Sequence, residues 1–182
     1  NITDSVLKGR LDLSKVALGG HSFGAGTTLG ISGITYPLKA VTKKLADSRI
    51  KAAVYLSPPV NLHGRSPSEV YGQIKIPGLL MTGTNDNSPI GKTPAEDRRK
   101  PFDGIAAPHQ YLVNYKNGDH AIFGGSSHRR ARPGDEEFHQ SINKVVGAFL
   151  DAYLLNDKSA KTWLDGDGAK AFVERNAMFE RK

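Results

Sequence analysis

Hydrophobic positions form four short continuous runs, separated by segments with helical spacing or turn residues. The runs are Val16–Leu18, Ala52–Leu56, Gly78–Met81 and Gln110–Val113. Continuous hydrophobicity, as opposed to strict alternation, is typical of strands buried on both faces of a parallel sheet. Parallel strands need crossover segments between them, and these are usually helices. The pattern therefore predicts an α/β fold with a mostly parallel sheet and helices on both faces.

Two crossover helices have local sequence signals. The small residues 24–32 predict a helix that packs close to the sheet. The segment Ser66–Glu69 has the spacing of a capping box, with Pro67 at the first helical position. It predicts a short helix that ends near Gly72.

The strongest helical pattern covers residues 136–155. Its hydrophobic positions recur every three or four residues and trace one face of a helix, and Asp135 is the predicted N-cap. Residues 156–182 are expected to form a helical tail that docks on the body of the domain. The apolar residues of this tail are Trp163, Leu164, Phe172 and Val173.

Composition is that of an ordinary globular domain. The 182 residues are 38% hydrophobic and 24% charged, which predicts one folded domain over residues 1–182 and excludes a disordered chain. No apolar run is long enough to span a bilayer. There is no leader-like segment, but the chain begins at Asn1 and not at Met, so its localisation in the cytoplasm or outside the cell stays open. The absence of cysteine excludes a thiolate nucleophile, a cysteine zinc site and any disulfide.

The net charge of +7 raises the question of nucleic-acid binding. The two densest basic runs, Arg98–Lys100 and His128–Arg132, lie among glycine and proline and lack interleaved aromatic residues. We interpret both as solvated loops, and no nucleic-acid partner is predicted. Attraction to acidic substrates stays open.

The segment Lys15–Gly26 is the most informative part of the chain. It predicts a strand, a sharp turn and a helix of small residues, with Gly20, Ser22 and Gly24 forming the pattern G-x-S-x-G. In such a nucleophile elbow a strained serine projects its hydroxyl above the sheet edge, and both glycines are expected to prevent a clash across the turn. The backbone N–H of Phe23 is the predicted oxyanion-hole donor. The alternative is a glycine-rich turn with an incidental serine, but the strand before it and the helix after it favour a catalytic Ser22.

With these motifs the chain resembles the α/β-hydrolase superfamily. It is most similar to bacterial esterases described as dienelactone-hydrolase-like or platelet-activating-factor-acetylhydrolase-like. Similar segments occur in the secreted lipase and cutinase-like branch, and dienelactone hydrolases proper use a cysteine that this chain lacks. The segments that carry the resemblance are Gly20–Ala25, Met81–Ile90 and Gly118–Phe123. The resemblance extends to about Leu155 and covers the C-terminal half of that fold.

The order of the fold predicts the acid and the base. In α/β-hydrolases the acid follows a later strand and the histidine follows the last one. Asp86 follows the run that begins at Gly78, and His120 follows the run that begins at Gln110. Ser22, Asp86 and His120 are therefore the predicted catalytic residues, with His120 as the base and Asp86 orienting its ring.

Other histidines and acids fit these roles less well. We expect His21 to be a structural ring that points away from the serine. His63 follows the wrong strand, and His109 precedes its strand. His128 lies in a basic loop, and His139 lies on a helix surface. Asp103 lies further along the loop, and Asp119 is too close in sequence to His120. An ordinary turn aspartate at Asp86 and a loop histidine at His120 are the remaining alternatives.

No cluster has metal-ligand spacing, and the predicted chemistry needs no metal or organic cofactor. The stretch Asp165–Gly168 superficially resembles a calcium loop, but Ala169 and Lys170 follow where ligands would stand, which favours a simple turn.

An apolar strand at Val16–Leu18 with nothing beside it would be a bare hydrophobic edge, which proteins avoid. The second oxyanion donor usually comes from an earlier loop, and no suitable glycine run precedes Ser22. We therefore expect this chain to be the C-terminal half of a longer hydrolase whose N-terminal half is its partner. A minimal four-strand hydrolase is the alternative.

The sequence thus predicts a serine hydrolase that cleaves a small carboxylic ester through an acyl-enzyme intermediate. A serine peptidase and an acyltransferase of the same fold remain alternatives. A non-catalytic binding protein of this fold is the alternative from another class.

Overall fold

The structure, a computed structural model, describes residues 7–35, 45–88, 91–124 and 134–182. These residues contain a five-stranded sheet in the order β1-β2-β3-β4-β5. Strands β1 to β4 are parallel, and β5 runs antiparallel to β4. The strands are β1 (Val16–His21), β2 (Ile50–Leu56), β3 (Gly78–Asn85), β4 (Gln110–Asp119) and β5 (Ala177–Arg181). The predicted mostly parallel α/β sheet is confirmed.

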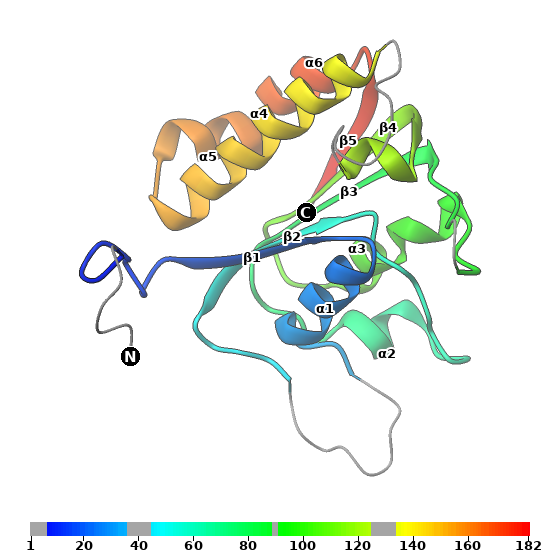
Figure 1. The fold of residues 1–182 in the computed structure, drawn as a ribbon, viewed down its shortest axis with the longest axis horizontal. Coiled ribbons are helices and arrows are strands. Elements are labelled where there is room, and N and C mark those ends of the chain that lie inside the picture. Colours follow the sequence, from blue (N-terminus) through cyan, green and yellow to red (C-terminus); the bar gives the residue numbers. More distant parts are fainter. Residues whose placement is uncertain (1–6, 36–44, 89–90, 125–133) are drawn as a thin grey trace.

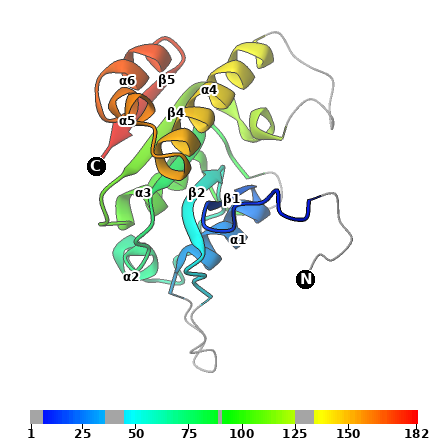
Figure 2. The same ribbon diagram turned by 90° about the vertical axis from the view of Figure 1, so that its left-hand side faces the viewer.

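Helices cover both faces of this sheet (Figures 1 and 2). The helices that connect the parallel strands, α1 to α3, lie on one face, and α4 to α6 lie on the other. The first group is α1 (Phe23–Ser32), α2 (Pro67–Tyr71), the 3-10 helix η1 (Ala95–Arg99) and α3 (Lys100–Gly104). The elements after β4 are the 3-10 helix η2 (His120–Phe123), α4 (Asp135–Leu154), α5 (Lys158–Asp165) and α6 (Gly168–Val173).

The central strands are buried on both faces, as their continuous hydrophobicity predicts. Successive side chains of a strand point to opposite faces, so each strand contributes to two cores. In β2, Tyr55 packs in the core beneath α1 and α2, whereas Val54 packs in the core beneath α4. In β3, Leu80 and Met81 divide in the same way.

The first residues of α2 and α4 can be compared with the sequence signals that predicted them. The capping box is confirmed, because the Ser66 hydroxyl accepts from the Glu69 N–H at 3.3 Å and a Glu69 carboxylate oxygen accepts from the Ser66 N–H at 2.8 Å. The prediction of Asp135 as the N-cap of the long helix is wrong. Gly134 is the N-cap, with φ 89°, and Asp135 is the first residue of α4. A left-handed backbone at this position suits glycine better than aspartate.

The tail forms α5 and α6, as predicted, and also strand β5, which was not predicted. In the stretch Asp165–Gly168, which resembles a calcium loop, Asp165 ends α5, Gly168 begins α6, and residues 166–167 link the two helices. The new strand closes the β4 edge of the sheet, and the Arg99 guanidinium donates to both carboxylate oxygens of Glu180 in β5, at 2.9 Å each.

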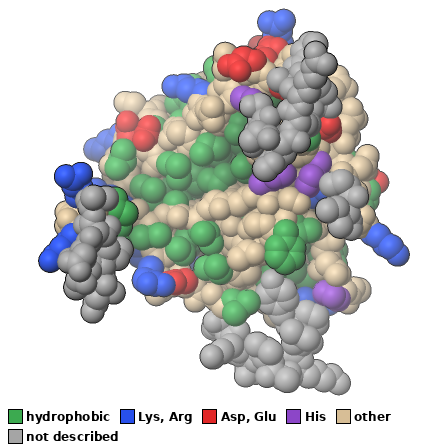
Figure 3. Space-filling view, viewed as in Figure 1, with side chains coloured by type: hydrophobic (Ala, Val, Ile, Leu, Met, Phe, Trp, Pro, Cys, Tyr) green, Lys and Arg blue, Asp and Glu red, His purple; other side chains and the backbone are tan. Residues whose placement is uncertain are grey.

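The opposite edge of the sheet is formed by β1, which pairs with β2 on one side. Its residues Val16, Ala17 and Leu18 are half-buried. Leu13, just before the strand, is 74% exposed. Figure 3 shows hydrophobic side chains gathered on the face where β1 lies in front. Among the described residues, no helix is both long enough and apolar enough to cross a membrane.

Candidate active site

Four polar residues each directly follow one of the four parallel strands. Ser22 follows β1, Ser57 follows β2, Asp86 follows β3 and His120 follows β4. The carboxyl ends of parallel strands meet at the same edge of a sheet, so these side chains are brought together although they are far apart in sequence. Three of the four are the predicted catalytic residues, and Ser57 was not anticipated.

The turn at Ser22 has the geometry of a nucleophile elbow. Its backbone has φ 55° and ψ −120°, a conformation that is uncommon for a residue with a side chain. The Ser22 N–H donates to the Leu56 carbonyl at 2.9 Å and anchors the turn to β2. A Cβ at Gly20 would lie 2.4 Å from the carbonyl carbon of Gly24, so the turn requires glycine at position 20.

Gly24 was expected to prevent a similar clash, and the structure does not show one there. A Cβ on Gly24 would meet no atom within 4 Å outside its own helix backbone. The two glycines are therefore not equivalent: the Cβ direction of Gly20 points across the turn, and that of Gly24 points into open space.

His120 lies between the serine and the acid. Its Nε2 is 2.9 Å from the Ser22 hydroxyl oxygen, and its Nδ1 is 2.8 Å from Oδ1 of Asp86. With the ring proton on Nδ1, facing the carboxylate, the lone pair of Nε2 faces the serine hydroxyl. This is the arrangement in which an imidazole can accept the proton of a serine.

Asp86 is fully buried and accepts several hydrogen bonds. The Ser57 hydroxyl donates to its Oδ1 at 2.8 Å, and the Thr82 hydroxyl donates to its Oδ2 at 2.9 Å. The Ser57 oxygen also lies 2.6 Å from Nδ1 of His120. Ser57 is therefore a second link between the acid and the ring, beside their direct contact. Its position immediately after a buried strand was the available sequence signal.

Arg98 overturns one sequence interpretation. The run Arg98–Lys100 was expected to be a solvated loop, but Arg98 is only 1% exposed and its Nε lies 3.0 Å from Asp86 Oδ1. Burial lowers the pKa of the Arg98 guanidinium, and the charge of Asp86 opposes that shift. Arg99, next in the chain, is 37% exposed and pairs with Asp103. The other basic run, His128–Arg132, lies outside the described residues.

The competing histidines and acids take other places. Asp119 accepts from the Ala121 N–H at 3.1 Å and caps η2. His21 has its Nε2 3.0 Å from the His120 carbonyl oxygen, and the two rings are 4.7 Å apart, so it supports the loop that carries His120. Burial is the largest cause that lowers the pKa of His21, and the charge of His120 lowers it further. His63 and His109 have positive φ, and His63 lines a groove together with Phe23. His139 lies in α4, and His128 lies outside the described residues.

The predicted oxyanion donor, the N–H of Phe23, is at the first position of α1. The first backbone N–H groups of a helix have no partner within the helix, and the helix dipole adds partial positive charge there. The Phe23 side chain is 86% exposed.

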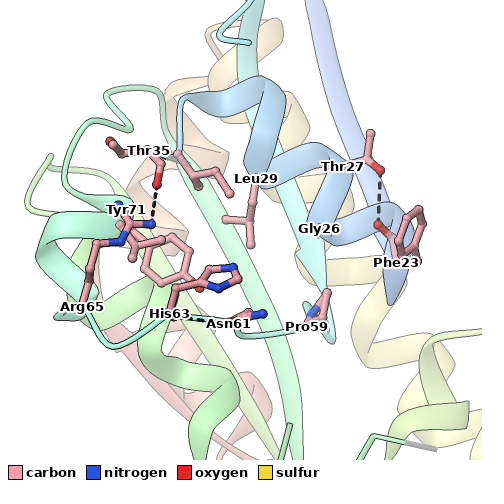
Figure 4. Close-up of a pocket in the computed structure, with 12 residues that line it drawn as sticks. Phe23, Gly26, Thr27, Leu29, Thr35, Pro59, Asn61, His63, Arg65 and Tyr71 are labelled. Atoms are coloured by element: carbon pink, nitrogen blue, oxygen red, sulfur yellow. Dashed lines mark hydrogen bonds between the residues drawn. The ribbon is translucent and has the colours of Figure 1, made fainter. Parts of the chain in front are cut away.

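A groove begins at Phe23 and runs between α1 and residues 59–65 (Figure 4). Its volume is about 280 Å³. Leu29, Val70 and Pro59 give it an apolar wall, whereas His63 and Arg65 lie at its polar side. The Arg65 guanidinium donates to the Thr35 carbonyl at 2.6 Å. In the part of the chain that the structure describes, no group of three or more histidine, aspartate or glutamate residues is arranged to hold a metal ion.

Comparison with known proteins gives one informative relative. The chain is similar to platelet-activating factor acetylhydrolase from Cavia porcellus, with 28% identity over 177 residues. The match covers 92% of this chain and 37% of that protein, so the chain spans little more than a third of the relative's length. No family model matches the chain. At this identity the similarity supports, together with the α/β fold, a relationship to esterases of the α/β-hydrolase kind.

Proposed function

We propose that this chain is a serine hydrolase that cleaves carboxylic esters through an acyl-enzyme intermediate. Ser22 is the nucleophile, His120 the general base and Asp86 the acid that orients it. The observation that carries the proposal is the continuous contact from the Ser22 hydroxyl to His120 Nε2, at 2.9 Å, and from His120 Nδ1 to Asp86, at 2.8 Å. The similarity to an acetylhydrolase, an enzyme named for removing an acetyl group, supports the same class of reaction.

In the acylation step the Ser22 oxygen forms a bond to the ester carbonyl carbon while its proton moves to His120 Nε2. The carbonyl π electrons move to the oxygen, where the Phe23 N–H stabilises the negative charge. When the tetrahedral species collapses, the bond to the leaving alcohol breaks and the imidazolium donates its proton to that oxygen. A water molecule then attacks the acyl carbon while His120 takes its proton. The bond between that carbon and the Ser22 oxygen breaks, the imidazolium returns the proton to Ser22, and the carboxylic acid product leaves. These steps use no metal and no organic cofactor.

The groove beside Phe23 is the proposed binding place for the acyl chain. Its volume of about 280 Å³ lies near the lower end of the roughly 300–1,000 Å³ typical of small-molecule sites, which favours short or medium acyl groups. The net charge of +7 and the nearby Arg65 favour tolerance of anionic esters. Hydrolysis rates for nitrophenyl esters of increasing acyl length are expected to peak at short or medium chains. A steady rise to long chains would exclude the groove as the acyl site.

The β1 edge supports a further proposal about the whole enzyme. Strand β1 has a half-buried apolar sequence and no second neighbour among the described strands, so we propose that a further strand outside residues 1–182 pairs with it. The same additional segment would supply the second oxyanion donor, whose loss costs about 10²–10³ in turnover. Full esterase activity from residues 1–182 as a stable monomer would contradict this proposal.

Ester hydrolysis itself is the test of the proposed function. The protein purified together with the proposed additional segment is expected to hydrolyse 4-nitrophenyl acetate, and its Ser22→Ala variant is expected to lose this activity while keeping its circular dichroism spectrum. Equal or faster turnover of peptide amides would favour the peptidase alternative. Activity that survives in Ser22→Ala would reject the proposal.

A further inference from the structure

Arg98 is the most deeply buried charged side chain near the proposed catalytic residues. Its guanidinium contacts three separate parts of the site. Nε donates to the Asp86 carbonyl at 2.6 Å and pairs with Asp86 Oδ1 at 3.0 Å. Nη1 donates to the carbonyls of Ser57 and Pro58 at 2.9 and 2.8 Å. Nη2 lies 3.3 Å from His120 Nδ1. One side chain thus joins the end of β2, the loop after β3 and the histidine ring.

These contacts hold the acid and Ser57 in one arrangement. Ser57 has φ 50°, an uncommon conformation for a residue with a side chain, and it is fully buried. Such a conformation persists only where the surroundings determine it, and the Arg98 bonds to the Ser57 and Pro58 carbonyls do so here. The Ser57 hydroxyl is thereby held within 2.8 Å of Asp86 Oδ1 and 2.6 Å of His120 Nδ1.

The charge of Arg98 also acts on the ring. Both Arg98 Nη2 and a protonated Nδ1 are hydrogen-bond donors, so their 3.3 Å separation is a contact between like partial charges. The other ionisable groups that face the ring or adjoin it are His21, with its ring at 4.7 Å, and Asp119, the preceding residue, which caps η2.

We propose that Arg98 and Ser57 are positioning residues for the Asp86–His120 pair. The inference rests on the proposed esterase function. It goes beyond that function because it assigns roles to two residues outside the serine, histidine and acid.

The test uses variants of both residues and a matched control. Arg98→Met removes the charge and the hydrogen bonds, Arg98→Lys keeps the charge, and Ser57→Ala removes only the hydroxyl. Arg99→Met removes the neighbouring guanidinium, which faces Asp103 and Glu180 and lies away from the ring. The readouts are kcat and KM for 4-nitrophenyl acetate across pH, together with the melting temperature.

We expect Arg98→Met and Ser57→Ala to lower kcat by about 10–100-fold with little change in KM, because misplacement of a catalytic group acts on the transition state. Arg98→Lys is expected to keep more of the wild-type kcat than Arg98→Met, because it keeps a positive charge beside Asp86. Arg99→Met is expected to leave kcat unchanged.

Wild-type kcat in Arg98→Met would overturn the inference. If Arg98→Met does not fold, Arg98→Lys and Ser57→Ala decide the matter, and wild-type kcat in both would also overturn it. A wild-type enzyme that contains the proposed additional segment and does not hydrolyse esters would instead reject the proposed function. Ester hydrolysis by the wild type with unaffected variants would reject only this inference.

Discussion

The two nitrogens of His120 have very different surroundings. Nε2 faces the Ser22 hydroxyl, next to the exposed Phe23 at the mouth of a groove. Nδ1 faces a closed group of polar side chains that are each at most 1% exposed. The members of this closed group are Ser57, Thr82, Asp86 and Arg98.

The difference separates two requirements of the proposed chemistry. On the closed side, hydrogen bonds in a water-excluded environment fix the ring and its tautomer before any substrate arrives. On the open side, the serine hydroxyl is held by a strained backbone turn and leaves room for the ester. Precise orientation and substrate access are thus provided by different parts of the same edge of the sheet.

The largest expected effect comes from the open side. Ser22→Ala and His120→Ala should each reduce kcat by at least about 10⁴-fold, because the nucleophile and its base act as one unit. For the same reason the double variant should lose little more than either single variant. Steady-state kinetics with 4-nitrophenyl acetate measure this, and additive losses would show that the two residues act independently.

Substitution of Asp86, at the centre of the closed group, should lower kcat by nearly as much. Asp86→Asn keeps the shape of the side chain but removes the charge that orients His120, so kcat should fall by about 10³–10⁴-fold. Asp103→Asn is the matched control, because Asp103 is 41% exposed and pairs with Arg99. That control should change kcat less than about threefold. Equal losses in both variants would remove Asp86 from its proposed role.

Alanine substitutions of the two glycines of the elbow should have smaller effects, and these should differ between Gly20 and Gly24. Gly20→Ala places a methyl group 2.4 Å from Gly24, so it should lower the free energy of unfolding by about 1–3 kcal/mol and reduce activity. Gly24→Ala meets open space and should be within about 1 kcal/mol of the wild type. Urea unfolding of both variants measures the difference. A larger loss in Gly24→Ala would contradict the description of the turn.

The smallest effect concerns His21, which supports the loop of His120. Its pKa is lowered in the folded state, so the unfolded chain binds a proton more readily. The contribution of neutral His21 to stability should therefore be complete above the ordinary value of 6.5 and decrease as the pH falls below it. His21→Asn should make the stability less dependent on pH in that range. Urea unfolding at several pH values tests this, and an unchanged slope in the variant would contradict it.

Much of the fold follows from local sequence signals. The continuous runs identify all four parallel strands, and the Ser66–Glu69 capping box marks the start of α2. Strand β5 could not be predicted in this way, because Ala177–Arg181 is short, ends in two charged residues and forms only by pairing with β4, whose partner residues lie 62 to 70 positions earlier.

Prediction of the site is limited in the same way, because contacts between distant residues leave no local signal. Ser22, Asp86 and His120 are identifiable because a motif and a strand order single them out. Arg98 could not be found, because its burial depends on contacts with Ser57 and Asp86, 41 and 12 positions away. A basic residue looks the same in sequence whether it is partly exposed, as at Arg99, or buried, as at Arg98.

Labelling with a fluorophosphonate probe, followed by mass spectrometry of the peptides, tests the central claim most directly. Two serines contact the ring of His120: Ser22 at Nε2 and the fully buried Ser57 near Nδ1. The account predicts one adduct, on Ser22, and its loss in His120→Ala. An adduct on Ser57, or hydrolysis of esters by a protein that forms no adduct on Ser22, would contradict it.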